Sequence, residues 1–219
     1  MSHLRPAILA ILLAVFFGVG LATKPASAGD EGQKRLDDGL LDPSWFGPGV
    51  VFRQAEDIDY LWVKPGFTVK GRKLHIDKWA DPVFLGKERR PKDSAKAAEL
   101  TEVMPTRMRG ALGAALAGYA EVSRDDGDLV MTGRFVDCNT GSKAKKWLIG
   151  MGAGHADATW DIKIVDKTSG EVLVAIHHRC VSGTTMSEID DKIAKWLEKF
   201  GKALHNDLVV SGSNAPANS

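Results

Sequence analysis

Two consecutive strand-like stretches constrain the fold of this sequence more than any other feature. From Ala156 to Asp166 small or apolar residues alternate with polar ones, and a second β-rich stretch runs from Glu171 to Val181. A period of two is typical of a strand with one buried face. Thr168-Ser169-Gly170 favours a tight turn with Gly170 in the left-handed conformation. We therefore predict an antiparallel hairpin.

The turn also predicts the register of this hairpin. The expected cross-strand partners are Lys167 with Glu171, Ile164 with Val174, Ile162 with Ile176, Asp161 with His177, and Trp160 with His178. His178 then lies on the apolar face and His177 on the face that the pattern predicts to be wet. Imidazole is a common zinc ligand, but adjacent strand residues point to opposite faces. We therefore expect structural roles for His155, His177 and His178, and no metal site.

The remaining elements complete a two-layer α+β fold. Two strands are expected first, at 60–63 and 72–78, and they form a hairpin or lie side by side. A helix follows from about Asp93, and Pro105 kinks or splits it. Strands at 128–138, 156–166 and 171–181 come next, and a helix from Ser187 ends the domain. This ββαβββα order predicts a roughly five-stranded, mostly antiparallel sheet with two helices packed on one face.

The N-terminus has the features of a secretory signal peptide. Arg5 precedes an uncharged run from Ala7 to Ala22, and the small residues Ala26-Ser27-Ala28 follow. Cleavage is expected after Ala28. The alternative is an uncleaved anchor, although the run is shorter than the ~20 residues of a relaxed membrane span. No cysteine lies near the cleavage site, so we expect a free periplasmic or secreted protein with no transmembrane segment in the mature chain.

The mature chain is predicted to hold one domain. Residues 29–57 are rich in Gly, Asp and Pro and predict an extended arm or linker that Trp45 and Phe46 pack onto the domain. Residues 58–210 are expected to form a single α+β domain, and residues 211–219 a disordered tail. Loss of residues 1–28 removes Arg5 and Lys24 and changes the net charge from +1 to −1. This balance gives no reason to expect nucleic-acid binding.

Export raises the question of a disulfide between Cys138 and Cys180, the two cysteines of the chain. Each ends a predicted strand, and both strand ends lie at the same end of the sheet. Neighbouring strands permit a disulfide. If the two strands flank a central one, the cysteines are about 10 Å apart and no bridge forms without a bend.

Two further motifs have both a functional and a structural interpretation. Gly150, Gly152 and Gly154 resemble a phosphate loop, but an alternating strand follows where a dinucleotide loop needs a helix, so we expect a structural bend and no cofactor. The basic clusters Lys87–Lys92 and Lys143–Lys146 form either solvated faces or an anionic-partner site. Lys145, Lys146 and Trp147 are the candidate partner-binding residues.

No catalytic motif was identified in the sequence. A Ser-His-Asp signature, paired catalytic carboxylates and HExxH are not apparent, so we assign no catalytic residue, although a fold can assemble a triad from distant positions. The leading hypothesis is a non-catalytic binding or structural component. The alternative is a small exported hydrolase built from dispersed His and Asp residues, which requires a pocket where His155 or His177 meets a carboxylate.

The segment 141–179 resembles an uncharacterised family of bacterial envelope proteins, the domain of unknown function 4410. The matching residues are Gly141, Lys145, Lys146, Trp147, Gly150, Gly152, Gly154, Asp166, Ser169 and Gly170. The resemblance implies an α+β fold and a place in the cell envelope, with an envelope protein or a cell-wall or lipid component as partner. It implies no activity and no catalytic residue.

Overall fold

The computed structural model describes residues 39–55, 58–141, 155–181, 189–206 and 208. Its centre is a six-stranded sheet with the order β1-β6-β5-β4-β2-β3. The strands are β1 (Tyr60–Val63), β2 (Lys73–Ile76), β3 (Glu121–Ser123), β4 (Leu129–Asn139), β5 (Asp157–Asp166) and β6 (Val172–Val181). β1, β6, β5 and β4 pair in antiparallel fashion, whereas β2 is parallel to both β3 and β4.

The predicted fold class is correct, but two details of the sheet are wrong. The described sheet has six strands because Glu121–Ser123 forms an additional edge strand. The first two strands form no hairpin: three strands lie between β1 and β2. β1 pairs with β6 and β2 inserts between β3 and β4. Strands of four residues carry too little pattern to specify their partners.

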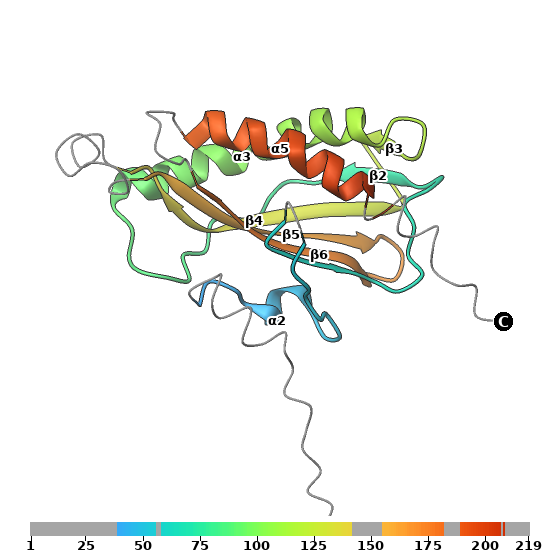
Figure 1. Ribbon diagram of the computed structural model, residues 1–219, viewed down its shortest axis with the longest axis horizontal. Coiled ribbons are helices and arrows are strands. Elements are labelled where there is room, and N and C mark those ends of the chain that lie inside the picture. The colour runs from blue at the N-terminus through green and yellow to red at the C-terminus, as the bar shows by residue number, and fades with distance from the viewer. Residues whose placement is uncertain (1–38, 56–57, 142–154, 182–188, 207, 209–219) are drawn as a thin grey trace, which may run out of the picture.

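Two long helices cover one face of the sheet (Figure 1). They are α3 (Pro91–Ala115) and α5 (Ile189–His205). Pro105 lies inside α3 and does not split it. The apolar residues that recur at helical spacing in α5 are buried: Ile189, Ile193, Trp196, Leu197, Phe200 and Leu204. Among the described residues no helix has both the length and the apolar character that a membrane span requires.

Aromatic rings fill the centre of this core. Trp160 on β5 makes edge contacts with Phe135 and with Trp196, whose ring centroid lies 4.6 Å away. His178 stacks on Trp196 at 4.5 Å. The prediction that His178 faces Trp160 on the apolar side is therefore confirmed.

The hairpin register is confirmed over most of its length. Ile162 pairs with Ile176 and Ile164 with Val174. Between Ile164 and Val165 a β-bulge shifts the register, so that the Asp166 amide bonds the Glu171 carbonyl and the predicted Lys167 to Glu171 pairing is wrong. Gly170 has φ +72°, the left-handed conformation that its turn was predicted to need.

The two cysteines are free and buried. Cys138 on β4 and Cys180 on β6 both pair with Ala158, so they lie on opposite sides of β5. Two strand spacings separate them by about 10 Å, beyond the reach of a disulfide. The disulfide that export made an open question is therefore not formed.

Residues 39–55 cover part of the second face of the sheet, and Asp161 and His177 on that face are buried and not wet as predicted. They include the short helix α2 (Pro43–Phe46), which lies on the side opposite α3 and α5 (Figure 1). Phe46 and Phe52 pack with Tyr60 and Ala175 into a second apolar cluster. The hairpin pattern correctly predicted polar residues on this face, but it contained no information about what covers them.

A buried ion network connects these residues to the sheet. The Asp161 carboxylate, fully buried, lies 2.7 Å from His177 Nδ1 and accepts a 2.9 Å bond from Arg134 Nε. Arg134 Nη2 then reaches Asp42, which caps α2, at 3.0 Å. The predicted pair of Asp161 and His177 is confirmed, but both side chains are buried.

We predict that Arg134→Met lowers the free energy of unfolding by about 3 to 5 kcal/mol, because it leaves the buried Asp161 carboxylate without its guanidinium. Chemical denaturation measures the change. The double variant Arg134→Met/Asp161→Leu should regain most of the loss, since no buried charge is then unpaired, and exposed Lys199→Met should change stability by less than about 0.5 kcal/mol. A single variant as stable as the wild type would contradict the assigned network.

Candidate functional site

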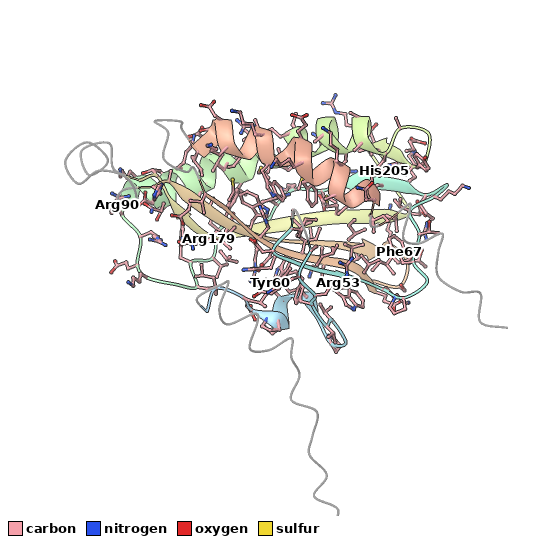
Figure 2. The ribbon with its side chains drawn as sticks, viewed as in Figure 1. Arg53, Tyr60, Phe67, Arg90, Arg179 and His205 are labelled. Carbon is pink, nitrogen blue, oxygen red and sulfur yellow. The ribbon has the colours of Figure 1, made fainter. Side chains whose placement is uncertain are left out.

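A polar pocket opens at the end of the sheet where β4 and β6 finish and β5 begins. The N-terminal end of α3 closes it from the helix side, and its volume is about 470 Å³. Figure 2 shows Arg90 and Arg179 at this end of the molecule, far from Phe67. The charged and amide groups that line the pocket are Glu88, Arg89, Arg90, Asp93, Asn139, Asp157 and Arg179, and Glu88 is exposed.

Buried carboxylates hold the arginines of this pocket in place. Arg89 makes a two-pronged ion pair with Asp137, which is buried. Arg90 binds Asp93 through Nε at 2.6 Å and Nη2 at 3.0 Å. Arg179 Nη2 lies 3.5 Å from Asp157. Guanidinium groups fixed in this way are pre-organised, because little rotamer entropy remains to be lost on binding.

Asp93 is the best-satisfied acid of the group. Its side chain is buried, and Oδ1 also accepts bonds from the Thr140 amide at 2.8 Å and the Thr140 hydroxyl at 2.7 Å. Burial alone would raise the pKa of this carboxyl, but the bonds from Arg90 and Thr140 outweigh it and lower the pKa to about 2. Asp93 is thus a fixed negative charge and a poor proton acceptor at neutral pH.

The first basic cluster, Lys87–Lys92, contacts Gly141, the described residue that lies nearest in the chain to the second cluster. Lys92 Nζ donates to the Gly141 carbonyl at 3.1 Å, and Arg90 Nη2 reaches the same oxygen at 3.4 Å. Gly141 directly precedes the segment that carries Lys143, Lys145 and Lys146. The side chains of Arg90 and Arg179 are 48% and 41% exposed, whereas the partner acids are buried. We call the surface formed by the cluster Lys87–Lys92 and by Arg179 the basic end.

Most of the predicted site residues lie outside the described residues. They are Lys145, Lys146, Trp147, Gly150, Gly152 and Gly154, together with Ala28 and the rest of the predicted signal peptide and the tail 211–219. The segment 142–154 begins after Gly141 and ends before His155, and both of these residues line the polar pocket. The candidate partner-binding segment is therefore tethered at the basic end at both of its ends.

Several of the described side chains that could take part in catalysis are buried or paired. Asp161 and His177 form a close pair, but both are buried beneath residues 39–55. Burial raises the pKa of the Cys138 thiol to about 12 and that of the Cys180 thiol to about 11. His155 lines the polar pocket beside Asp157, whose Oδ2 accepts from Asn139 at 3.1 Å. Within the described residues no three His, Cys, Asp or Glu side chains are grouped to bind a metal.

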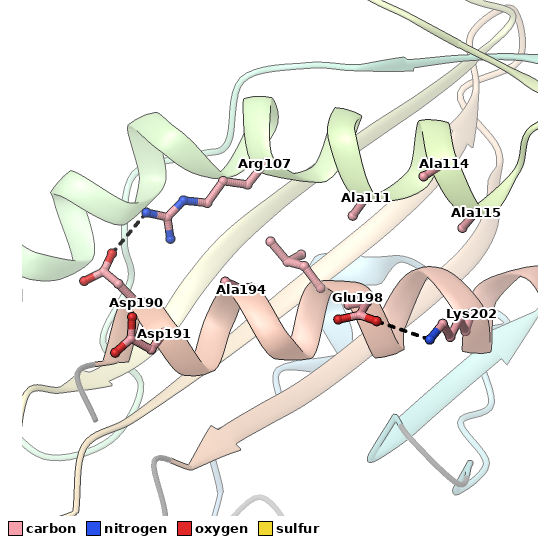
Figure 3. Close-up of a pocket in the computed structure, with 10 residues that line it drawn as sticks. Arg107, Ala111, Ala114, Ala115, Asp190, Asp191, Ala194, Glu198 and Lys202 are labelled. Carbon is pink, nitrogen blue, oxygen red and sulfur yellow. Dashed lines mark hydrogen bonds and ion pairs between the residues drawn. The ribbon is translucent and has the colours of Figure 1, made fainter. Parts of the chain in front are cut away.

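A groove of about 640 Å³ runs between α3 and α5 (Figure 3). Its floor is apolar, and Ala111, Ala114 and Ala115 line it from α3. The helices approach closely where a side chain on Gly201 would come within 3.0 Å of the Ala115 Cβ. Arg107 bonds Asp190 at 3.2 Å and ties the other end of the groove. Close helix packing therefore accounts for the small residues.

The sequence analysis missed Arg179, Asp93, Asp137, Asn139 and Asp157. Arg90 and Asn139 are 49 positions apart in the chain, and their 3.0 Å hydrogen bond depends on the strand order. The only signal in the sequence was the cluster of polar residues at the predicted strand ends. These polar residues predict a common site only when the strand order is known, because the order shows which strand ends lie together.

Comparisons with known proteins place the chain in a family and show structures of similar fold. A family model described as "Domain of unknown function (DUF4410)" matches residues 63–185. No curated protein matches the chain. A PelC dodecamer subunit from Paraburkholderia phytofirmans is similar at 8% identity, with 66% of this chain and 93% of that chain covered and a TM-score of 0.43.

Two further solved structures are similar at comparable levels. A DUF330 protein from Xanthomonas campestris is 13% identical, with 69% of this chain and 91% of that chain covered and a TM-score of 0.40. A lipoprotein from Neisseria meningitidis is 12% identical, with coverage of 67% and 99% and a TM-score of 0.34.

We predict that Asp93 contributes a pH-dependent part of the stability. Because its folded-state pKa is depressed, its contribution of about 2 kcal/mol is fully present above a pH of about 4 and is lost as the pH falls through about 2. In urea unfolding from pH 5 to pH 2, Asp93→Asn should be less stable than the wild type at pH 5 and equal to the wild type at pH 2. The exposed Asp126→Asn variant should change little. A difference for Asp93→Asn that is constant with pH would contradict the assigned pKa.

Proposed function

We propose that this chain, which belongs to the family described as Domain of unknown function (DUF4410), is an exported binding protein of the bacterial cell envelope that contacts an anionic envelope component. Its basic end carries partly exposed guanidinium groups and the exposed Lys92. Lipid head groups and cell-wall polymers supply phosphate and carboxylate groups that match guanidinium and ammonium donors. The observation that carries the proposal is that Lys92 and Arg90 both donate to the Gly141 carbonyl, two positions before Lys143 in the chain.

The charge distribution supports binding at this end. The acids Asp93, Asp137 and Asp157 are buried, whereas their guanidinium partners are partly exposed. The guanidinium groups of Arg89, Arg90 and Arg179 are thus held in place by buried carboxylates and keep part of their own surface open to a ligand. Trp147 adds an aromatic residue to the same segment, as expected for a contact with an interface or a partner.

Export is supported by the sequence alone. The uncharged run from Ala7 to Ala22 and the small residues before Gly29 favour cleavage after Ala28 and delivery to the periplasm or the exterior. We propose the domain division on the same basis: an arm at 29–57, one domain at 58–210 and a short tail.

The hydrolase alternative has one observation in its favour, the position of His155 in the polar pocket beside Asp157. It is disfavoured because Asp157 is already bonded by Asn139 and faces Arg179, and because Asp93 is a weak base. Pre-paired acids suit recognition better than proton transfer.

We predict that Lys87→Glu/Lys92→Glu weakens binding to anionic vesicles by about 2 kcal/mol, roughly thirtyfold, since each lysine near an anionic surface contributes about 1 kcal/mol. Sedimentation with phosphatidylglycerol vesicles and with purified cell-wall sacculi distinguishes the two sources of negative charge, and phosphatidylcholine vesicles give the background. Binding should also fall as the salt concentration rises.

The matched control is Lys199→Glu/Lys202→Glu, which makes the same change in charge on the exposed side of α5. It should bind like the wild type. An equal loss of vesicle binding in both variants would show that binding depends only on net charge and would contradict a specific site. Absence of binding to either anionic probe would overturn the proposal. If the protein releases soluble products from either probe and His155→Ala abolishes this release, the hydrolase alternative would replace the binding proposal.

A further inference from the structure

A second cavity lies at the opposite end of the sheet from the basic end. It has a volume of about 660 Å³ and is bounded by the turn after α2, by the end of β1 and by the start of β6. Because β1 runs antiparallel to β6, the end of β1 lies beside the start of β6, the far end of that strand from Arg179. The size falls within the range of small-molecule sites, about 300 to 1,000 Å³. We call it the arm cavity.

Trp62 supplies an aromatic surface to the arm cavity. It lies on the edge strand β1 opposite Ala175, packs against the cluster of Phe46, Phe52 and Tyr60, and is only half-buried. Since the ring packs on that cluster and also lines the cavity, it offers ring surface to a ligand from a rigid support.

Trp45 has a different role in the same cavity. Arg134 lies 4.7 Å and Lys163 4.3 Å from the centroid of its ring. Lys163 Nζ also donates to the Trp45 carbonyl at 3.0 Å. These cations already use the ring face that they cover, so Trp45 forms a fixed wall and Trp62 is the free platform.

Hydrogen-bonding groups stand at the edge of the cavity. Lys64 and Glu171 lie 2.5 Å apart, with side chains 38% and 52% exposed, and both line the cavity. They offer donors and an acceptor with almost balanced charge. A purely aliphatic ligand would remove water from these groups without replacing its hydrogen bonds. An anion is not favoured, because Lys64 is paired and Lys163 is engaged with Trp45.

We propose that the arm cavity binds a neutral saccharide, with one sugar ring stacked on Trp62 and its hydroxyl groups bonded by Lys64 and Glu171. A pyranose ring has an apolar face of C–H groups and a periphery of hydroxyl groups. The polarised C–H groups match the negative face of an indole ring, and the hydroxyl groups match both members of the ion pair. The site goes beyond the proposed function, which rests on the other end of the sheet.

The test is a titration of the full chain with three neutral probes, N,N′-diacetylchitobiose, cellobiose and maltose, followed by calorimetry and tryptophan fluorescence. At least one probe should bind with a dissociation constant of about 1 mM or lower. Trp62→Ala should weaken it by at least about tenfold, or 1.4 kcal/mol. Glu171→Ala, an exposed change that leaves the aromatic cluster intact, should weaken it severalfold, and Trp62→Phe should keep most of the affinity.

Trp147→Ala is the matched control, because it removes a tryptophan from the segment at the basic end and should leave saccharide affinity unchanged. Binding of none of the three probes, or equal affinity in the wild type, Trp62→Ala and Glu171→Ala, would overturn the inference. Anionic vesicles report on the basic end separately, since Lys87→Glu/Lys92→Glu should lose vesicle binding and keep saccharide binding. A failure of the saccharide proposal at the arm cavity is therefore distinguishable from a failure of the anion-binding proposal at the basic end.

Discussion

The buried carboxylate of Asp161 is the constraint on which the arrangement of this molecule depends. It lies on the central strand β5 with no solvent exposure, where an unpaired charge would be strongly destabilising. Its partners come from both neighbouring strands, Arg134 on β4 and His177 on β6. Arg134 in turn binds Asp42, so the position of residues 39–55 follows from the pairing of a charge inside the sheet. The arm cavity exists because this covering segment is held there.

The same physical principle shapes the basic end. Buried acids near the end of β4, at the start of β5 and at the start of α3 each hold an arginine, and the outer parts of these cations remain accessible. Buried ion pairs contribute little net stability when their desolvation is included, but they fix geometry. In this protein that geometry places Arg90 and Lys92 on the Gly141 carbonyl and so positions one anchor of the segment 142–154.

Local pattern predicted the parts of the fold that are local. The register of Ile162 with Ile176 follows from alternation and turn chemistry, and the buried stripe of α5 follows from helical spacing. The alternation in residues 156–166 and the hairpin register placed Asp161 and His177 on a polar face. They carried no information about Asp42 or Arg134, which are 92 positions apart. The insertion of β2 beside β4, the separation of Cys138 from Cys180 by β5 and the assembly of the polar pocket depend on the same long-range order. Residues that the strand order brings together from distant positions share no local pattern that a single sequence could reveal.

The central claim, that the basic end is the contact surface of an envelope-binding protein, is tested most directly by photo-crosslinking in growing bacteria. A crosslinkable amino acid at position 147 should give a reproducible adduct in the envelope fraction, whereas one at position 199 on the exposed side of α5 should give none. Intact-mass analysis of the captured chain identifies the adduct as lipid, polymer or protein and also reports cleavage after Ala28. The account predicts an anionic lipid or polymer at position 147 on a processed chain. Equal adducts at both positions, or an unprocessed chain crosslinked to cytoplasmic proteins, would contradict it.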